Sequence, residues 1–117
     1  TNAPRAYAER VLGALGIGHH FEALISIEDM RMFGELRPKP DARMFRALLK
    51  RLRVPAARCV LVEDTLQHQK AARRVGMKTV WMQRWTRAAG KPGARFHLKP
   101  PYVDVRTRSL RALRSLR

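Results

Sequence analysis

Two adjacent carboxylates, Glu63 and Asp64, stand where an apolar run gives way to a helix-like segment, in the stretch CVLVEDTLQHQKAARRVGM. Two oxygen donors at such a position suit a hard divalent cation, because Mg²⁺ commonly takes one or two protein carboxylates and completes its shell with water and substrate phosphate. Aspartate and threonine are also frequent helix N-caps, so Asp64 or Thr65 could simply begin the helix that follows. The tetrapeptide VEDT alone favours neither interpretation.

Two further places could contact an anion. Lys39 lies between two prolines, which restrict the backbone around it, so a stiff lysine precedes the next helix. An ordinary exposed lysine is the alternative, because most lysines lie at the surface. Thr1 and Asn2 directly precede a helix that begins near Pro4, where free N–H groups and the helix dipole favour phosphate. Helix capping by these side chains is the simpler local explanation.

Alternating helices and strands must position these residues. Helices are indicated by apolar residues at helical spacing that stop at glycine or proline, and strands by short apolar runs. The patterns predict helices at 4–15, 41–52, 65–75 and 109–117, strands at 21–27, 59–62, 78–82 and 102–105, and loops at 28–40 and 86–101. The run at 59–62 lacks polar alternation, so we expect it to be covered on both faces. The order predicts an α/β fold with a Rossmann-like parallel sheet and flanking helices, in which ligands bind outside the carboxyl ends of the strands.

The net charge of +16 has two explanations. Phosphate backbones reward dense Lys and Arg, so a nucleic-acid partner would suit it. The chain has 19 Arg and 6 Lys, and such an excess of Arg is also typical of a genome-wide codon bias, with the charges lying on solvated helix faces. The basic stretches lack interleaved aromatic residues and nucleic-acid motifs, so dedicated nucleic-acid binding is the less favoured alternative.

The single cysteine, Cys59, has no partner within the chain for a disulfide and lies in an apolar run, as a buried core residue would. No stretch approaches the roughly 20 apolar residues that cross a bilayer, so no membrane association is expected. A cytoplasmic, reducing setting is the simplest expectation. Two aromatic residues are candidates for different places: Trp81 for the core, and Trp85 for either the substrate side or a cover over the sheet.

The segments TNA, KP and VEDTLQHQKAARRVGMKTVWM follow one another as motifs two, three and four of the haloacid dehalogenase (HAD) superfamily do, and the chain resembles that superfamily over residues 1–105. The last segment is the most specific and is similar to the pyrimidine 5'-nucleotidase-like branch. The resemblance implies that residues 1–117 are the C-terminal part of a single HAD-like α/β core domain, incomplete at its N-terminus. In this branch the position of His68 often carries asparagine.

The resemblance also implies a role for each candidate residue. Thr1 would donate its hydroxyl to the phosphoryl group, with Asn2 as a neighbouring amide. Lys39 would neutralise charge on the phosphoryl group and on the nucleophile. Asp64 would bind Mg²⁺ directly, and Glu63 directly or through water. The implied activity is that of a Mg²⁺-dependent phosphomonoesterase on a small phosphate ester, with a nucleotide monophosphate favoured. These residues suit that activity, because phosphoryl transfer depends mainly on positioning and charge neutralisation, which a metal ion and a lysine supply.

The nucleophile of the family has no candidate in the sequence. HAD enzymes form an aspartyl-phosphate on the first Asp of a DxDxT/V motif, whereas Asp29, Asp41 and Asp104 lack a second Asp two positions on. We therefore expect that motif upstream of Thr1, with the first strand and the cap region also absent. The run at 59–62 would then be an unpaired hydrophobic edge. We expect these residues to belong to a larger enzyme and to be neither catalytic nor stably folded alone; a degenerate, inactive HAD-like domain is a further alternative.

Overall fold

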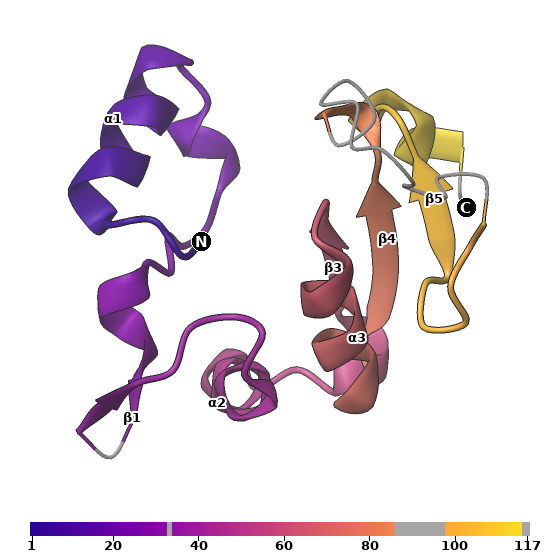
Figure 1. Ribbon diagram of the computed structural model, residues 1–117. Coiled ribbons are helices and arrows are strands. Elements are labelled where there is room, and N and C mark those ends of the chain that lie inside the picture. The colour runs from indigo at the N-terminus through magenta and orange to yellow at the C-terminus, as the bar shows by residue number, and fades with distance from the viewer. Residues whose placement is uncertain (33, 86–97, 116–117) are drawn as a thin grey trace.

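The computed structural model describes residues 1–32, 34–85 and 98–115. It has the predicted α/β fold, with a parallel three-stranded sheet and flanking helices (Figure 1). The helices are α1 (Arg5–Ala14), α2 (Ala42–Leu52) and α3 (Leu66–Arg74), with short 3₁₀ helices η1 (Gly18–His20), η2 (Ile27–Met30), η3 (Ala56–Arg58) and η4 (Leu110–Ser115). The strands are β1 (Arg31–Met32), β2 (Glu35–Leu36), β3 (Val60–Glu63), β4 (Lys78–Met82) and β5 (Val105–Thr107). Within the described ranges, no helix is long and apolar enough to cross a membrane.

The main sheet has the order β3-β4-β5, and both strand pairs are parallel. Its carboxyl ends therefore meet at one edge, where Glu63 ends β3 and Met82 ends β4. Strand β3 pairs with β4 alone among the described segments, as expected for an unpaired edge. The expectation that this strand is covered on both faces is wrong, because the side chains of Val60 and Val62 are 53% and 41% exposed.

The bounds of α2, β3, α3 and β4 lie within a residue or two of the predicted ranges, because local sequence features begin and end these elements. The Asp41 carboxylate accepts a hydrogen bond from the backbone N–H of Arg43 (2.8 Å) and so caps α2. Arg53, in the left-handed region at φ 54°, ends that helix. Gly76 follows α3 at φ +89°, a conformation that glycine adopts without strain. The predicted strand at 78–82 is confirmed as β4.

The segment predicted as a strand at 21–27 forms none. Its backbone bonds to the chain start: the N-terminal ammonium of Thr1 donates to the carbonyl of Ile25 (2.8 Å), and the N–H of Ile27 donates to Ala3 (3.2 Å). A capping box between Ser26 and Asp29 then begins η2. The backbone is extended at Phe21 and at Ser26, but no neighbouring strand is present in the described chain to pair with the segment.

Three other predictions also need correction. Within the predicted loop at 28–40, β1 and β2 form a small antiparallel hairpin. The strand predicted at 102–105 begins only at Val105, because the Asp104 carboxylate accepts hydrogen bonds from the N–H and hydroxyl of Thr79 and fixes the entry to β5. The predicted last helix at 109–117 is the 3₁₀ helix η4 as far as the structure describes it. Most of the predicted loop at 86–101 lies outside the described residues.

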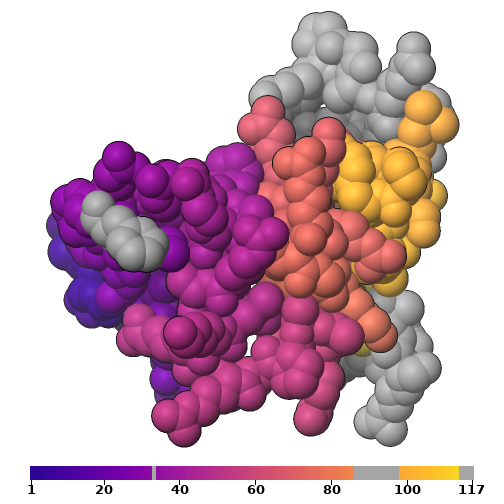
Figure 2. All heavy atoms as spheres, turned by 90° about the horizontal axis from the view of Figure 1, so that it is seen from below, coloured from indigo at the N-terminus to yellow at the C-terminus, as the bar shows by residue number. Residues whose placement is uncertain are grey.

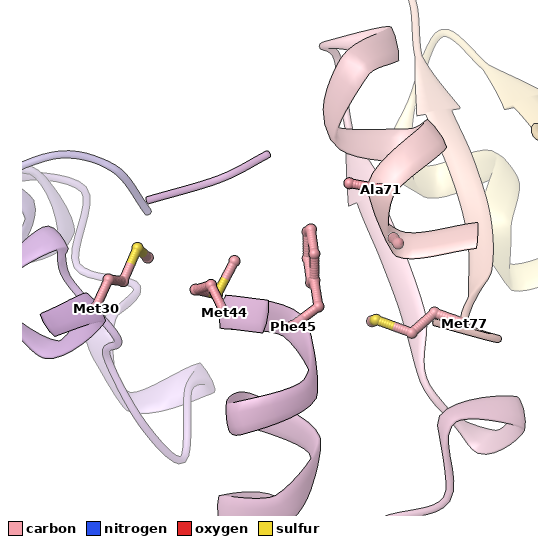
Figure 3. Close-up of a cluster of buried hydrophobic side chains, with 6 residues drawn as sticks. Met30, Met44, Phe45, Ala71 and Met77 are labelled. Carbon is pink, nitrogen blue, oxygen red and sulfur yellow. The ribbon is translucent and has the colours of Figure 1, made fainter. Parts of the chain in front are cut away.

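The hydrophobic core joins the two halves of the chain through α2, which lies between the N-terminal segment and the sheet (Figures 1 and 2). Met44 lies on the side of Met30, and Phe45 on the side of Ala71 and Met77 (Figure 3). Phe45 is 1% exposed. Helix α3 packs on β3 and β4 and begins shortly after the carboxyl end of β3.

Replacing Phe45 with alanine is expected to lower the free energy of unfolding by about 3–5 kcal/mol, because it leaves a large cavity at this junction. The matched control is Leu52→Ala on the same helix, where the side chain is 48% exposed and the loss should stay below about 1 kcal/mol. Urea denaturation of the full gene product measures both. Similar losses for the two variants would contradict the assigned core.

Candidate active site

The acidic pair lies at the carboxyl end of β3, directly before α3. Glu63 is the last residue of the strand, and Asp64 follows it. The Thr65 hydroxyl donates to Asp64 Oδ1 (3.2 Å) and makes no capping bond to α3. The interpretation of these residues as a side-chain cap is therefore not supported. The indole N–H of Trp81, a core residue as predicted, donates to the carbonyl of Asp64 (2.9 Å) and ties the pair to β4.

The Glu63 carboxylate contacts side-chain and backbone groups from several parts of the site. Its Oε2 lies 2.5 Å from Lys39 Nζ and 3.2 Å from His68 Nδ1. Its Oε1 accepts hydrogen bonds from the backbone N–H groups of Asp64 (3.1 Å) and Thr65 (3.4 Å). Both oxygens are thus engaged by protein groups. The carboxylate of Asp64 accepts a hydrogen bond from the Thr65 hydroxyl and is also in hydrogen-bond contact with the Glu63 carboxylate.

Lys39 is held in place from two sides. Its side chain is 16% exposed, so it is not an ordinary surface lysine. Its backbone exchanges two hydrogen bonds with Asn2, whose Nδ2 donates to the Lys39 carbonyl (3.0 Å) and whose Oδ1 accepts from the Lys39 N–H (3.1 Å). Thr1 Oγ1 accepts from the N–H of Ala3 (3.1 Å) and so begins the turn into α1. The amide of Asn2 thus links the chain start to the lysine and, through it, to the acidic pair.

The two carboxyl groups differ in proton affinity. Burial would raise the pKa of Glu63, but hydrogen bonding with Asp64 and the contact with the Lys39 ammonium outweigh it and lower the pKa to about 2. The pKa of Asp64 is raised, first by its hydrogen bond to Glu63 and then by burial. Charge is therefore concentrated on Glu63, and a bound cation would favour the ionised form of Asp64 as well.

The depressed pKa of Glu63 predicts acid sensitivity. A carboxyl group whose pKa is lower in the folded state stabilises the fold above its unfolded-state pKa of about 4.3, and that contribution is lost as the pH falls towards 2. The thermal midpoint of the wild type should therefore fall more steeply between pH 5 and pH 2 than that of Glu63→Gln. Circular dichroism melts measure both profiles. Parallel profiles would contradict the Lys39–Glu63 pair.

The donor set suits an open metal site better than a closed one. Among the described residues there is no group of three or more His, Cys, Asp and Glu side chains that could enclose a metal ion. Mg²⁺ needs no such cage, since it commonly binds one or two carboxylates and takes water and substrate oxygens for the rest. Asp64 offers a carboxylate with free acceptor capacity, and Glu63 is turned towards Lys39.

Gln69 is a site residue that the sequence motifs do not indicate. It is fully buried on α3, and its Nε2 donates to the carbonyls of Glu63 (2.7 Å) and Val80 (2.8 Å). It thus joins the end of β3 to the middle of β4. The available signal is a polar side chain on the buried face of a helix, shared with Ala72 three residues on.

Comparisons with known proteins identify the family and the fold. The haloacid dehalogenase-like hydrolase family matches residues 1–76, a range that contains all five predicted site residues. The chain is 32% identical over 80 residues to the fructose-1-phosphate phosphatase YqaB of Escherichia coli (strain K12), which covers 68% of this chain and 40% of that protein. A solved structure described as a dehalogenase has the same fold, with a TM-score of 0.70 and 21% identity over 94% of this chain and 43% of that one.

The chain thus spans less than half the length of either relative. The family match covers the segment from Thr1 through the end of α3, and the structural match extends over the sheet. The chain belongs to the haloacid dehalogenase-like hydrolases.

Proposed function

We propose that this chain provides the phosphate- and metal-binding part of a Mg²⁺-dependent phosphomonoesterase. The observation that carries the proposal is the contact of Lys39 Nζ with Glu63 (2.5 Å) beside the open carboxylate of Asp64, at the carboxyl end of a parallel sheet. A fixed cation next to a metal-binding carboxylate suits a phosphoryl group, which carries charge on its oxygens throughout its transfer. The family and the phosphatase relative support this reaction class.

Each residue has a defined task in this proposal. Lys39 neutralises the phosphoryl oxygens, and Glu63 holds its ammonium in place. Asn2 fixes the lysine backbone, and the Thr1 hydroxyl donates to the phosphoryl group. Asp64 would hold the metal ion, and Glu63 would contact it directly or through water. The bound Mg²⁺ supplies charge neutralisation and orients the phosphate.

The nucleophile is an aspartate outside the 117 residues. The three other aspartates all have structural partners: Asp29 accepts from Ser26 and Arg5, Asp41 caps α2, and Asp104 accepts from Thr79. None ends a strand beside Asp64. The aspartyl-phosphate therefore forms on a residue supplied from elsewhere in the enzyme, and water then hydrolyses it.

The substrate is a small phosphate monoester. The resemblance of the segment around Glu63 to pyrimidine 5'-nucleotidases favours a nucleotide monophosphate, whereas the relative YqaB is described as a fructose-1-phosphate phosphatase. Both classes present the same phosphoryl group to Lys39 and Asp64. They differ in the part of the ester that lies beyond it.

A substrate panel tests the proposal. The full gene product is assayed for phosphate release from sugar phosphates and nucleoside monophosphates, with Mg²⁺ and with excess chelator. We expect hydrolysis of at least one ester with Mg²⁺ and its loss with chelator, restored by Mg²⁺. Absence of hydrolysis across the panel, or hydrolysis that persists without a divalent cation, would contradict the proposal.

A further inference from the structure

A cavity of about 750 Å³ lies at the carboxyl end of the sheet and includes both members of the acidic pair in its wall. Beside apolar side chains, its lining contains exposed basic residues and a tryptophan that is 66% exposed. The polar and aromatic residues that matter here are Glu63, Asp64, Arg84, Trp85, Arg108 and Arg111. The cavity is therefore continuous with the proposed metal site.

The strand topology brings the basic residues together. Asp64 follows the end of β3, Arg84 lies just beyond the end of β4, and Arg108 directly follows β5. Because the three strands are parallel, these positions share one edge of the sheet. Arg111, on η4, adds a third guanidinium from the segment after β5. Side chains from the segments after β3, β4 and β5 thus line one cavity outside the strand ends, where α/β folds bind ligands.

No described carboxylate pairs with the arginines of this cavity, a property that they share with other exposed arginines such as Arg10, Arg46 and Arg58. Four arginines on other surfaces form ion pairs with carboxylates: Arg5, Arg37, Arg43 and Arg73. Arg84, Arg108 and Arg111 form none with any described carboxylate. Glu63 is already paired with Lys39, so it does not offset them. Like charges that line one cavity repel each other, and an anion bound between them would offset that repulsion.

Trp85 gives the same cavity a flat apolar surface. The guanidinium carbon of Arg84 lies 5.0 Å from the centre of the Trp85 ring, a cation–π contact that holds both side chains at the cavity wall. A guanidinium oriented in this way presents its N–H groups in a plane, which suits the paired oxygens of a carboxylate or a phosphate.

We propose that Arg84, Arg108 and Arg111 form a second anion subsite, and that the substrate is a phosphate monoester carrying a further anionic group. This inference rests on the proposed function and narrows its substrate to esters with a second anionic group, which a nucleoside monophosphate and fructose 1-phosphate both lack. The scissile phosphoryl group lies at Lys39 and Asp64, and the second phosphate or carboxylate of the same molecule lies between the arginines. Esters of neutral alcohols or sugars leave the subsite unfilled.

Two esters that differ only in the second phosphate test the subsite: fructose 1-phosphate and fructose 1,6-bisphosphate. In the full gene product with Mg²⁺, kcat/KM for release of the 1-phosphate is expected to be at least about tenfold higher for the bisphosphate, as charge-assisted hydrogen bonds require. The variant Arg84→Gln/Arg108→Gln/Arg111→Gln should lose this preference and leave kcat for fructose 1-phosphate within about threefold.

A matched control separates local contacts from overall charge. The variant Arg10→Gln/Arg46→Gln/Arg58→Gln removes the same charge from exposed positions on α1, α2 and η3, away from the cavity lining. It should retain the preference for the bisphosphate. Single substitutions at Arg84, Arg108 and Arg111 replace the triple variant if that variant fails to fold, and each should lower the preference by about twofold or more.

The outcomes distinguish the two proposals. Hydrolysis that depends on Asp64 but shows no preference for the bisphosphate overturns the subsite alone. Absence of Asp64-dependent hydrolysis overturns the proposed function, and the subsite is then decided by calorimetry with Asp64→Asn. In that variant, the bisphosphate should bind at least about tenfold more tightly than fructose 1-phosphate, and the arginine substitutions should abolish the difference. Equal or undetectable binding of the bisphosphate overturns the subsite.

Discussion

Asp64→Asn is expected to lower kcat for phosphate ester hydrolysis by about 10³-fold or more in the full gene product. The substitution keeps the size of the side chain and removes the charge that holds Mg²⁺, so several kcal/mol of transition-state stabilisation are lost. KM for the ester should change much less, because Lys39 and the backbone around it still bind the phosphoryl group. Steady-state kinetics over a range of Mg²⁺ concentrations measure both constants.

The matched control is Asp41→Asn. It makes the same chemical change at the N-cap of α2, where asparagine caps a helix as well as aspartate does. Activity should stay within about threefold of the wild type, since Asp41 contacts Arg43 and Arg37 and not the acidic pair. Full Mg²⁺-dependent activity in Asp64→Asn would show that the metal site lies elsewhere.

Lys39→Met is the second change with a large expected effect. It removes the cation beside the phosphoryl group, which should lower kcat/KM by about 10²–10³-fold. It also leaves the Glu63 carboxylate, whose side chain is 14% exposed, without its closest partner. The free energy of unfolding should therefore fall as well, by about 1–3 kcal/mol.

A double variant separates the two effects of this substitution. In Lys39→Met/Glu63→Gln the unpaired charge is gone, so we expect part of the lost stability to return while the activity stays low. Lys50→Met, at an exposed position of α2, should leave both quantities close to the wild type. Recovery of activity in the double variant would mean that Lys39 acts only through the stability of the fold.

The elements with local signals were predictable from the sequence. Asp41 begins α2 through its own carboxylate, and Gly76 ends α3 because its φ of +89° suits glycine. The run at 78–82 ends in three apolar residues and forms β4. These features depend on neighbours in the sequence, so they can be read without knowledge of the tertiary structure.

The errors concern segments whose state depends on distant partners. The run at 21–27 has strand composition, but the described chain offers it no strand to pair with, and it has no regular secondary structure before η2 begins. The apolar run at 59–62 predicts a strand covered on both faces of the sheet, yet Val60 and Val62 of the edge strand β3 are exposed. The strand at 102–105 is shifted because Asp104 bonds to Thr79 through its side chain.

The site likewise has features that the sequence predicts and others that depend on contacts between distant residues. Motif order predicts that Lys39 and the acidic pair cooperate, but it gives no indication that Glu63 rather than Asp64 pairs with the lysine 24 residues away. The two hydrogen bonds between Asn2 and Lys39 likewise depend on the path of the chain. The role of Gln69 depends on how α3 packs against the sheet. A buried glutamine needs hydrogen-bond partners, and those of Gln69 are backbone carbonyls of β3 and β4.

Anomalous scattering from Mn²⁺, a substitute for Mg²⁺, tests the central claim most directly. Crystals of the full gene product grown with Mn²⁺ and an unreactive phosphate analogue locate both the metal and the phosphoryl oxygens. We expect a single strong peak within coordination distance of the Asp64 carboxylate, with the analogue in contact with Lys39 Nζ and the Thr1 hydroxyl. A metal peak away from Asp64, or an analogue bound without contact to Lys39, would contradict the proposed site.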